Sequence, residues 1–273
     1  MTTVQAIILG LVQGFTEFLP VSSSGHLIFL PRFFGWPDQG VAFDVVMHLG
    51  TLVAVIIFFR ARIRSLSRAL FSRDPGVAVE RKTAWLIGLS LVPAAAVGYL
   101  LETNFRSPLL TAVNLIGWGL VLGAADLYTR RRNRVRSEAQ PGTDVSSLNG
   151  RLTWKKALFI GSAQAVALLP GTSRSGITMT AGLFSGFGRT AAAEFSFLMS
   201  VPIIALAGLS KAAELFRGGL DNIAGAQLVW GFAASAVSGL IAIGLLMRVI
   251  KRWSFLPFVA YRLVIGILII LLV

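Results

Sequence analysis

Long apolar runs constrain the fold of this chain more than any other feature, because six of them, each near 20 residues, follow one another from residue 43 onward. A helix needs about 20 apolar residues to cross a hydrocarbon core of about 30 Å, and no run alternates with the period of two that marks a membrane β-strand. Only 14% of the residues are charged, against about a quarter in soluble domains. The sequence therefore predicts an all-α polytopic membrane protein with six transmembrane helices, at 43–59, 84–101, 109–128, 193–210, 226–247 and 256–273.

Basic residues gather in three segments between these runs, 60–83, 130–156 and 248–252. Two expected spans separate each segment from the next, so all three lie on one side of the membrane, and the positive-inside rule places that side in the cytoplasm. The net charge of +13 is then a topology signal, and we expect no nucleic acid as a partner. Both termini are expected on the opposite side, which carries far fewer cations: Arg32, Arg106, Lys211 and Arg217.

Two absences narrow the chemistry and the targeting. The first 31 residues contain no Lys or Arg, which argues against a cleaved signal peptide with a basic start. The chain also lacks cysteine, which excludes a disulfide, a thiolate nucleophile and a cysteine-based metal site.

The hydrophobic segments 4–35 and 155–190 differ from the six runs because Pro, Gly and Ser interrupt each of them in the middle. Neither half of such a segment is long enough to span a bilayer. Non-helical backbone at membrane depth is tolerated only where protein buries it or where it lines a cavity. We therefore expect each segment to form a re-entrant helix–loop–helix hairpin.

The two halves of the chain resemble each other at an offset of 151 residues, with 1–136 as the first half, 137–150 as a linker and 151–273 as the second half. Each half holds one hairpin and three spans, and because three is odd the second half is expected upside down relative to the first. Such inverted repeats place their site near the midplane, where the broken segments meet. The matched residues are Ala6, Gly10, Gln13, Ser22, Ser24 and Gly25 with Ala157, Gly161, Gln164, Ser173, Ser175 and Gly176, then, one residue further on, Phe43 and Met47 with Phe195 and Met199.

The first broken segment concentrates reactive side chains in residues 13–26, QGFTEFLPVSSSGH. Ionisable groups are costly at membrane depth and usually have a function there. Glu17 can act as a general base or bind a hard cation, and His26 can act as a nucleophile or carry a proton. A Glu17–His26 proton relay is the alternative. The hydroxyls of Ser22, Ser23 and Ser24 are further candidates, although a lone serine in a membrane helix often bonds its own backbone.

The second broken segment supplies a cation where the first supplies an acid. At the same offset, Arg174 corresponds to Ser23, while Leu168 corresponds to Glu17. A guanidinium presents a planar set of donors that suits phosphate oxygens, and a helix that begins after a Gly/Ser loop favours an anion at its N-terminus. If the loops face each other, we expect a chamber in which Arg174 binds phosphate with Ser24, Ser173, Ser175 and Thr178.

Four ionisable residues lie outside these motifs. We expect His48 to be a helix-packing residue. Arg262, in the last span, is expected to pair with an acid such as Glu194 or to extend its charged end to the membrane surface. Arg189 and Glu194 flank the start of a span and are expected to support the second loop.

Residues 13–26 and the run from Pro170 to Thr178, PGTSRSGIT, resemble the two signatures of the undecaprenyl-diphosphate phosphatase family of bacitracin-resistance type, and the tail FLPFVAYR (255–262) resembles its last span. The resemblance covers essentially the full length. It implies hydrolysis of a polyprenyl diphosphate, the lipid carrier of cell-wall synthesis, at the outer face of the bacterial cytoplasmic membrane. It also implies a divalent cation, Mg²⁺ or Ca²⁺, and a site formed by Glu17, His26, Arg174 and the neighbouring Ser and Thr residues.

One position departs from many members of that family: Gln13 stands where they carry a second Glu. A metal held at Gln13 and Glu17 would therefore have one carboxylate, and the remaining ligands would come from the substrate.

The resulting hypothesis is a lipid-diphosphate phosphatase in which Arg174 holds the terminal phosphate and stabilises charge in the transition state. Glu17 positions the metal or activates the nucleophile, and His26 or one of Ser22 to Ser24 attacks or transfers the proton. The alternative is a transporter or flippase of a polyprenyl phosphate or another anion, because inverted repeats with broken helices are also a transporter architecture. Both alternatives place the protein among membrane lipids, and the oligomeric state is open.

Overall fold

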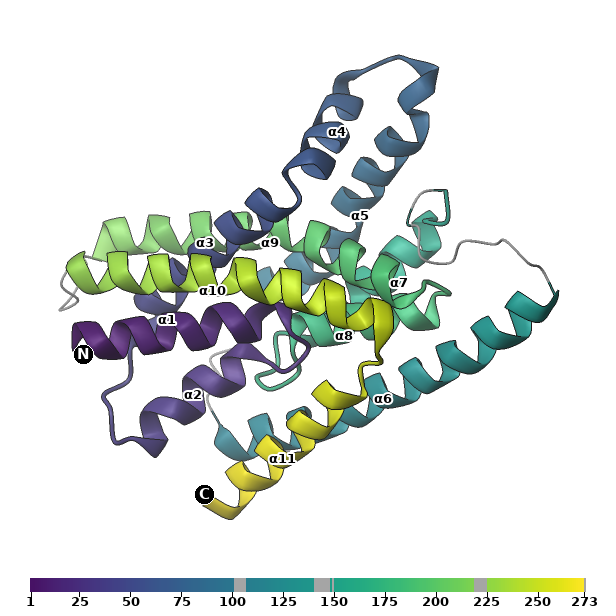
Figure 1. Ribbon diagram of the computed structural model, residues 1–273. Helices are drawn as coiled ribbons and strands as arrows, with labels where there is room; N and C mark the ends of the chain where they lie inside the picture. Colours follow the sequence, from purple (N-terminus) through teal and green to yellow (C-terminus); the bar gives the residue numbers. More distant parts are fainter. Residues whose placement is uncertain (101–106, 140–147, 149, 219–224, 273) are drawn as a thin grey trace.

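The computed structural model describes residues 1–100, 107–139, 148, 150–218 and 225–272. Helices account for all regular structure in this part of the chain, which confirms the all-α prediction (Figure 1). The helices are α1 (Thr3–Phe18), α2 (Ser23–Phe33), α3 (Gly40–Phe58), α4 (Arg60–Phe71), a 3-10 turn η1 (Pro75–Val77), α5 (Ala78–Leu100), α6 (Pro108–Ala139), α7 (Trp154–Val166), α8 (Arg174–Phe184), α9 (Arg189–Gly218), α10 (Gly225–Arg252) and α11 (Leu256–Leu272).

Five described helices are long and apolar enough to cross a membrane: α3, α5, α6, α9 and α10. They coincide with five of the six expected spans, and the protein is a multi-pass membrane protein. The sixth expected span corresponds to α11, which is equally apolar but only 17 residues long. A helix of that length rises about 26 Å at 1.5 Å per residue, which is slightly less than the hydrocarbon core.

Two segments that we expected to be basic loops are largely helical. Residues 60–83 form α4, η1 and the beginning of α5, and α6 continues through the basic residues to Ala139. Figure 1 shows α4 and the adjoining part of α5 projecting from the other helices as an arm. The positive-inside pattern reports on charge and not on backbone conformation, so it could not distinguish a helix from a loop.

The two broken hairpins, α1–α2 and α7–α8, match at the start of each of their helices. Thr2 and Thr153 cap the first helices, and Ser22 and Ser173 precede the second helices with φ of 72° and 71°. These serines are the two non-glycine residues with positive φ among those that the structure describes. Figure 1 shows α1 and α7 entering the molecule from opposite ends, as an inverted repeat requires. The division into halves at 136 and 151 stays a prediction, and most of the expected linker lies outside the described residues.

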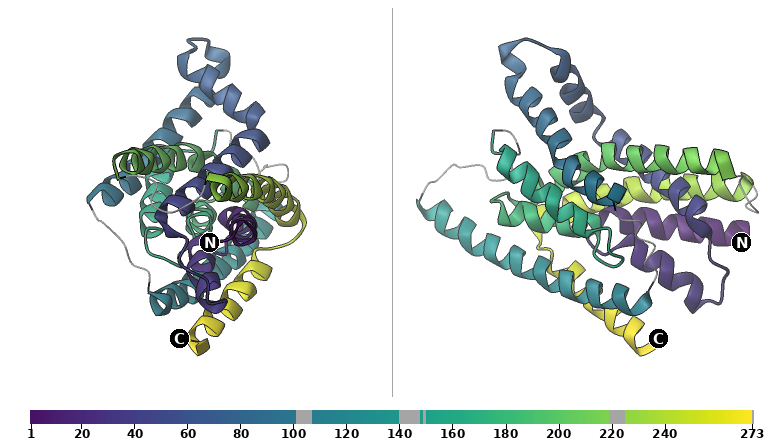
Figure 2. Two further views of the ribbon diagram at one scale, coloured as in Figure 1. Left: turned by 90° about the vertical axis from the view of Figure 1, so that its left-hand side faces the viewer. Right: turned by 180° about the vertical axis from the view of Figure 1, so that it is seen from behind.

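Each hairpin packs against a long helix from the opposite half of the chain. Helix α1 lies along α10, and α7 lies along α5, as the views in Figure 2 also show. Glycines permit this contact, because a Cβ on Gly14 would overlap the Ser235 carbonyl and a Cβ on Gly161 would overlap the Ser90 carbonyl. Small residues at such interfaces let membrane helices approach closely. The hairpins are therefore held by both halves, and their turns meet in the middle of the protein.

Candidate functional site

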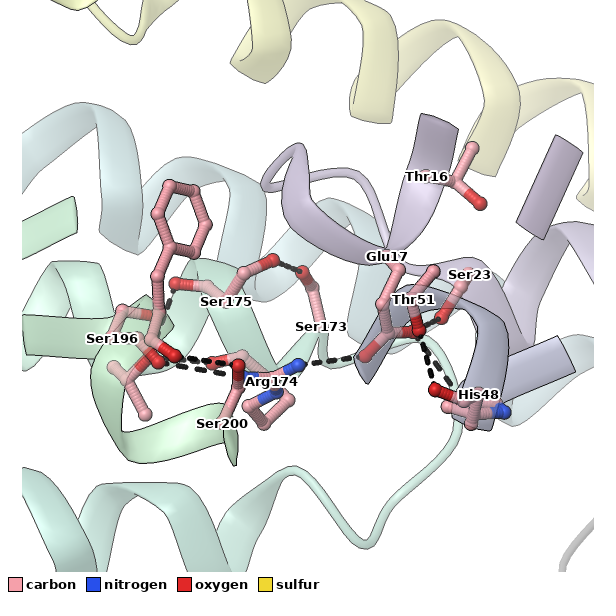
Figure 3. A network of polar contacts seen from close by, with 12 residues as sticks. Thr16, Glu17, Ser23, His48, Thr51, Ser173, Arg174, Ser175, Ser196 and Ser200 are labelled. Carbon is pink, nitrogen blue, oxygen red and sulfur yellow. Dashed lines mark hydrogen bonds and ion pairs between the residues drawn. The ribbon is translucent and has the colours of Figure 1, made fainter. Parts of the chain in front are cut away.

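The turns of the two hairpins bring a carboxylate and a guanidinium together across the molecule. Glu17 lies in the last turn of α1, and Arg174 is the first residue of α8. Arg174 Nη2 donates to Glu17 Oε1 at 2.7 Å, and both side chains are largely buried. Figure 3 shows this contact joining the two hairpins. The expected meeting of the acidic and cationic loops is thus present in the structure.

The second carboxylate oxygen of Glu17 receives three further groups. Ser23 Oγ donates to Glu17 Oε2 at 2.6 Å, and Gln13 Nε2 donates to the same oxygen at 3.3 Å. His48 Nε2 lies 3.3 Å from it. A carboxylate in so many charge-assisted contacts has a fixed orientation.

His48 is the residue of the site that the sequence analysis missed, and its assignment as a helix-packing residue was wrong. Its Nδ1 lies 2.6 Å from the Asp44 carbonyl oxygen, to which only a protonated nitrogen can donate. This bond turns Nε2 toward Glu17. The available signal was an imidazole inside an apolar span, which by itself suggests function.

A small cavity lies between the hairpin turns, with a volume of about 130 Å³. The N-termini of α2 and α8 both open on it, so backbone dipoles favour an anion there. Non-glycine residues at positive φ cost roughly 1–3 kcal/mol and cluster at functional sites, and Ser22 and Ser173 both line this cavity. The full lining is Glu17, Ser22, Ser23, Ser24, His48, Ala167, Ser173 and Arg174. We call this cavity the chamber.

Three of the predicted catalytic and phosphate-binding residues, His26, Ser175 and Thr178, do not line the chamber, and neither does Gln13, the tentative metal ligand. His26 Nδ1 lies 2.7 Å from the Ser22 carbonyl oxygen, and its Nε2 lies 2.7 Å from Tyr261 Oη. Ser175 Oγ donates to the Leu19 carbonyl at 3.1 Å and lies 3.2 Å from Ser173 Oγ. Thr178 Oγ1 lies 2.8 Å from the Arg174 carbonyl and 2.7 Å from Ser196 Oγ. These side chains hold the backbone around the chamber, so the structure does not place Ser175 and Thr178 where a phosphate-binding role was expected.

The donors around Glu17 do not form a metal site by themselves. Within the described residues no group of three or more His, Asp or Glu side chains is arranged to hold an ion. The Gln13 carbonyl oxygen already accepts from Ser235 Oγ at 2.5 Å, and both oxygens of Glu17 are engaged. Mg²⁺ and Ca²⁺ each take six or more oxygen ligands, so the residues present do not fit an ion held by the protein alone.

Arg262 is fully buried and holds both turns through their backbones. Its guanidinium donates to the carbonyls of Pro20 in the first turn and of Gly171 and Thr172 in the second, at 3.0–3.2 Å. It also donates to Leu115 and Asn114 in α6. The expectation that Arg262 pairs with an acid or extends to the surface was wrong, because five backbone carbonyls replace the acid.

Arg189 and Glu194 have partners away from the second loop. Arg189 makes two contacts with Asp126 of α6, at 2.5 and 3.1 Å, and Asp126 also accepts from the Phe255 amide. Glu194 lies 3.2 Å from Arg62 of α4. They tie α9 to neighbouring helices, so their expected support of the second loop was wrong.

Comparison with known proteins agrees with the full-length resemblance. The family described as "Bacitracin resistance protein BacA" matches residues 6–268. A protein of Hahella chejuensis named "Undecaprenyl-diphosphatase" is 45% identical over 276 residues, covering 97% of this chain and 96% of that protein. "Undecaprenyl-diphosphatase 2" of Stutzerimonas stutzeri and "Undecaprenyl-diphosphatase" of Geobacter metallireducens are each 44% identical, again covering 97% of this chain and 96% of the relative.

Proposed function

The chain belongs to the bacitracin resistance protein BacA family, and we propose that it hydrolyses undecaprenyl diphosphate to undecaprenyl phosphate and phosphate. This reaction recycles the lipid carrier of cell-wall synthesis. The observation that carries the proposal is the chain of contacts from Ser23 through Glu17 to Arg174, in which a hydroxyl, a base and a phosphate-binding cation line one chamber.

Ser23 is the nucleophile that the geometry supports best. Its hydroxyl donates to Glu17 Oε2 at 2.6 Å, which is the arrangement of an activated nucleophile and its general base. Both nitrogens of His26 are engaged outside the chamber, so the histidine is the weaker of the alternatives. Ser22 and Ser24 line the chamber but contact each other, with their Oγ atoms 3.2 Å apart.

The proposed reaction has two steps that balance. Ser23 Oγ attacks the terminal phosphorus while its proton passes to Glu17, the bond to the bridging oxygen breaks, and undecaprenyl phosphate leaves. Water then attacks the phosphoserine, the Ser23 oxygen leaves and regains its proton from Glu17, and both protons of the water leave with inorganic phosphate.

Arg174 stabilises the negative charge that develops on the transferred phosphoryl group. Fixed donors aimed at developing charge are usually the largest single contribution to catalysis. The hydroxyl of Ser173 and the helix N-termini of α2 and α8 complete the binding of the phosphate oxygens.

The polyprenyl chain has a mainly apolar cavity beside the chamber, with Arg32 and Thr111 as its polar lining residues. A cavity of about 470 Å³ lies between α2, α6 and α11, and Gly25, next to the chamber serines, forms part of its wall. Its other walls include Ile28, Phe29 and Phe33. We place the first isoprenoid units there, with the rest of the tail among the membrane lipids.

We also propose the bacterial cytoplasmic membrane as the location, with the chamber open to its outer face. The apolar cavity includes Pro108 and Leu272, at the helix ends remote from the basic ends of α6 and α10. Under the positive-inside rule those basic ends are cytoplasmic.

For the expected Mg²⁺ or Ca²⁺ ion, we propose only that it would bind together with the substrate. Since the protein offers one engaged carboxylate in the chamber, such an ion would be held mainly by diphosphate oxygens, and no step above depends on it.

Phosphate release from undecaprenyl diphosphate by the purified protein tests the function, with and without a chelator. We expect release by the wild type and loss of release in Ser23→Ala with an unchanged melting temperature. Failure of the wild type to release phosphate, together with counterflow of intact lipid phosphate in liposomes, would instead support the transporter.

A further inference from the structure

The arm formed by residues 60–83 is the part of the molecule that the proposed function does not use. It consists of α4, the turn η1 and the first residues of α5, and α4 packs chiefly against α5. Figures 1 and 2 show the arm projecting away from the remaining helices, on the half of the molecule where the basic ends of α6 and α10 lie. It therefore reaches sideways near the level of one membrane surface.

Among the four arginines of α4, Arg62 has different surroundings from the pair Arg64 and Arg68. Arg62 turns inward and contacts Glu194 at 3.2 Å and Glu80 at 3.9 Å. Arg64 and Arg68 lie one turn apart on the exposed side. Within the described part of the chain no hydrogen bond or ion pair is recorded for either of them, so their guanidinium donors are available to a ligand.

Arg64 and Arg68 form one side of a cavity of about 360 Å³. The hydroxyl residues Ser65 and Ser72 also line it, with small apolar side chains between them. The turn beyond it is fixed, since Arg81 donates to the Ser72 carbonyl at 2.6 Å. Two guanidinium groups and two hydroxyls around one hollow are the donors that recognise a phosphate group.

Two large apolar side chains on the arm and the adjoining part of α5 are exposed. Phe71, at the end of α4, is 90% exposed, and Trp85 on α5 is 66% exposed. A helix with basic residues on one side and large apolar residues at its edge is typical of segments that lie in the membrane interface. The phosphate offered to this cavity would then be attached to a lipid.

We propose that the cavity at Arg64 and Arg68 binds the phosphate of an anionic phospholipid headgroup, with Phe71 and Trp85 beside its acyl chains. Each basic residue near an anionic surface contributes enough for roughly a fivefold change in affinity, so the pair accounts for at least about a tenfold effect. Binding there holds the arm, and through it α3 and α5, at a fixed depth in the bilayer.

The test compares two double variants that lose the same charge. Arg64→Gln with Arg68→Gln removes the cavity donors, whereas Arg60→Gln with Arg73→Gln removes two exposed arginines of the same segment that do not line it. Native mass spectrometry of the detergent-purified full chain, titrated with phosphatidylglycerol or phosphatidylcholine, gives the affinity for each lipid.

We expect the cavity variant to bind phosphatidylglycerol about tenfold more weakly or worse, and the control variant to remain within twofold of the wild type. Phosphatidylcholine binding should be equal in all three. Equal losses in both variants would overturn the proposal in favour of diffuse charge. Displacement of the lipid by millimolar inorganic phosphate would contradict the proposal that the bound phosphate group belongs to a lipid. Unchanged phosphate release in detergent serves as the folding control.

Discussion

The hairpin α1–α2 and the hairpin α7–α8 begin their helices at equivalent positions but carry different side chains. Each begins on a capping threonine, and each starts its second helix after a serine at positive φ. Yet the first carries Glu17 and Ser23 where the second carries Leu168 and Arg174. The shared backbone fixes where a side chain will stand, and the substitutions decide what chemistry is available there.

Gln13 and Gln164, which stand at equivalent positions of the two hairpins, also differ in their contacts. Gln13 donates to Glu17 and accepts from Ser235, whereas neither polar atom of Gln164 has a hydrogen-bond partner among the described residues. At the offset of 151, Leu168 stands where the first half has Glu17, so no carboxylate is present at that position for Gln164 to contact. The glutamine of the first hairpin is part of a polar network, and that of the second hairpin is not.

Ser23→Ala should cause the largest loss of activity, because it removes the proposed nucleophile, which only the first hairpin supplies. We expect kcat to fall by about 10⁴-fold or more, as when a covalent nucleophile is removed. The control is Ser175→Ala, whose hydroxyl does not line the chamber and contacts the Leu19 carbonyl and Ser173 Oγ. Steady-state phosphate release measures both, and comparable losses in the two variants would contradict the assignment.

Arg174→Ala removes the cation that the second hairpin contributes, and it leaves Glu17 without its partner at 2.7 Å. We expect a loss of about 10²–10³-fold in kcat, typical of a lost transition-state donor. Arg174→Lys should recover only part of it, because an ammonium cannot reach both Glu17 and the Ser196 carbonyl. Activity near wild type in the alanine variant would remove Arg174 from the mechanism.

His48→Ala tests whether the contact with Glu17 positions the base. We expect kcat to fall by about 10–100-fold with little change in KM, because a base displaced by about 1 Å can cost that much. His48→Gln should restore much of the rate, since an amide can still donate to Glu17. At an offset of 152 the counterpart is Ser200, and Ser200→Ala should have almost no effect. If the glutamine variant is as poor as the alanine variant, simple positioning is ruled out.

His26→Ala should have the smallest effect of the four, a loss of roughly tenfold or less. Its ring contacts the Ser22 carbonyl and Tyr261 outside the chamber, so its removal acts only by loosening the turn. Tyr261→Phe should produce a similar, milder loss. A drop in kcat as large as that of Ser23→Ala would show that His26 takes part in the chemistry.

The contact between Glu17 and Arg174 could be predicted because two short polar motifs, at 13–26 and 170–178, stand at equivalent positions of the two similar segments. The contact of His48 could not, since its carboxylate partner lies on another helix and no motif surrounds it. Arg262 binds backbone carbonyls, which every residue carries, so the sequence suggested an acidic partner instead. Ser175 and Thr178 contact backbone carbonyls around the chamber, and such partners have no signature in the sequence.

The position of Arg262 in α11 also bears on how the protein is made. Both turns that it holds, at Pro20 and at Gly171–Thr172, leave the ribosome well before it does. A nascent chain halted before α11 carries every side chain of the chamber but lacks the group that fixes their backbones. We therefore expect that such a truncated chain inserts without activity, and that supplying α11 as a separate peptide restores some phosphate release. The enzyme would then remain inactive until α11 has entered the membrane.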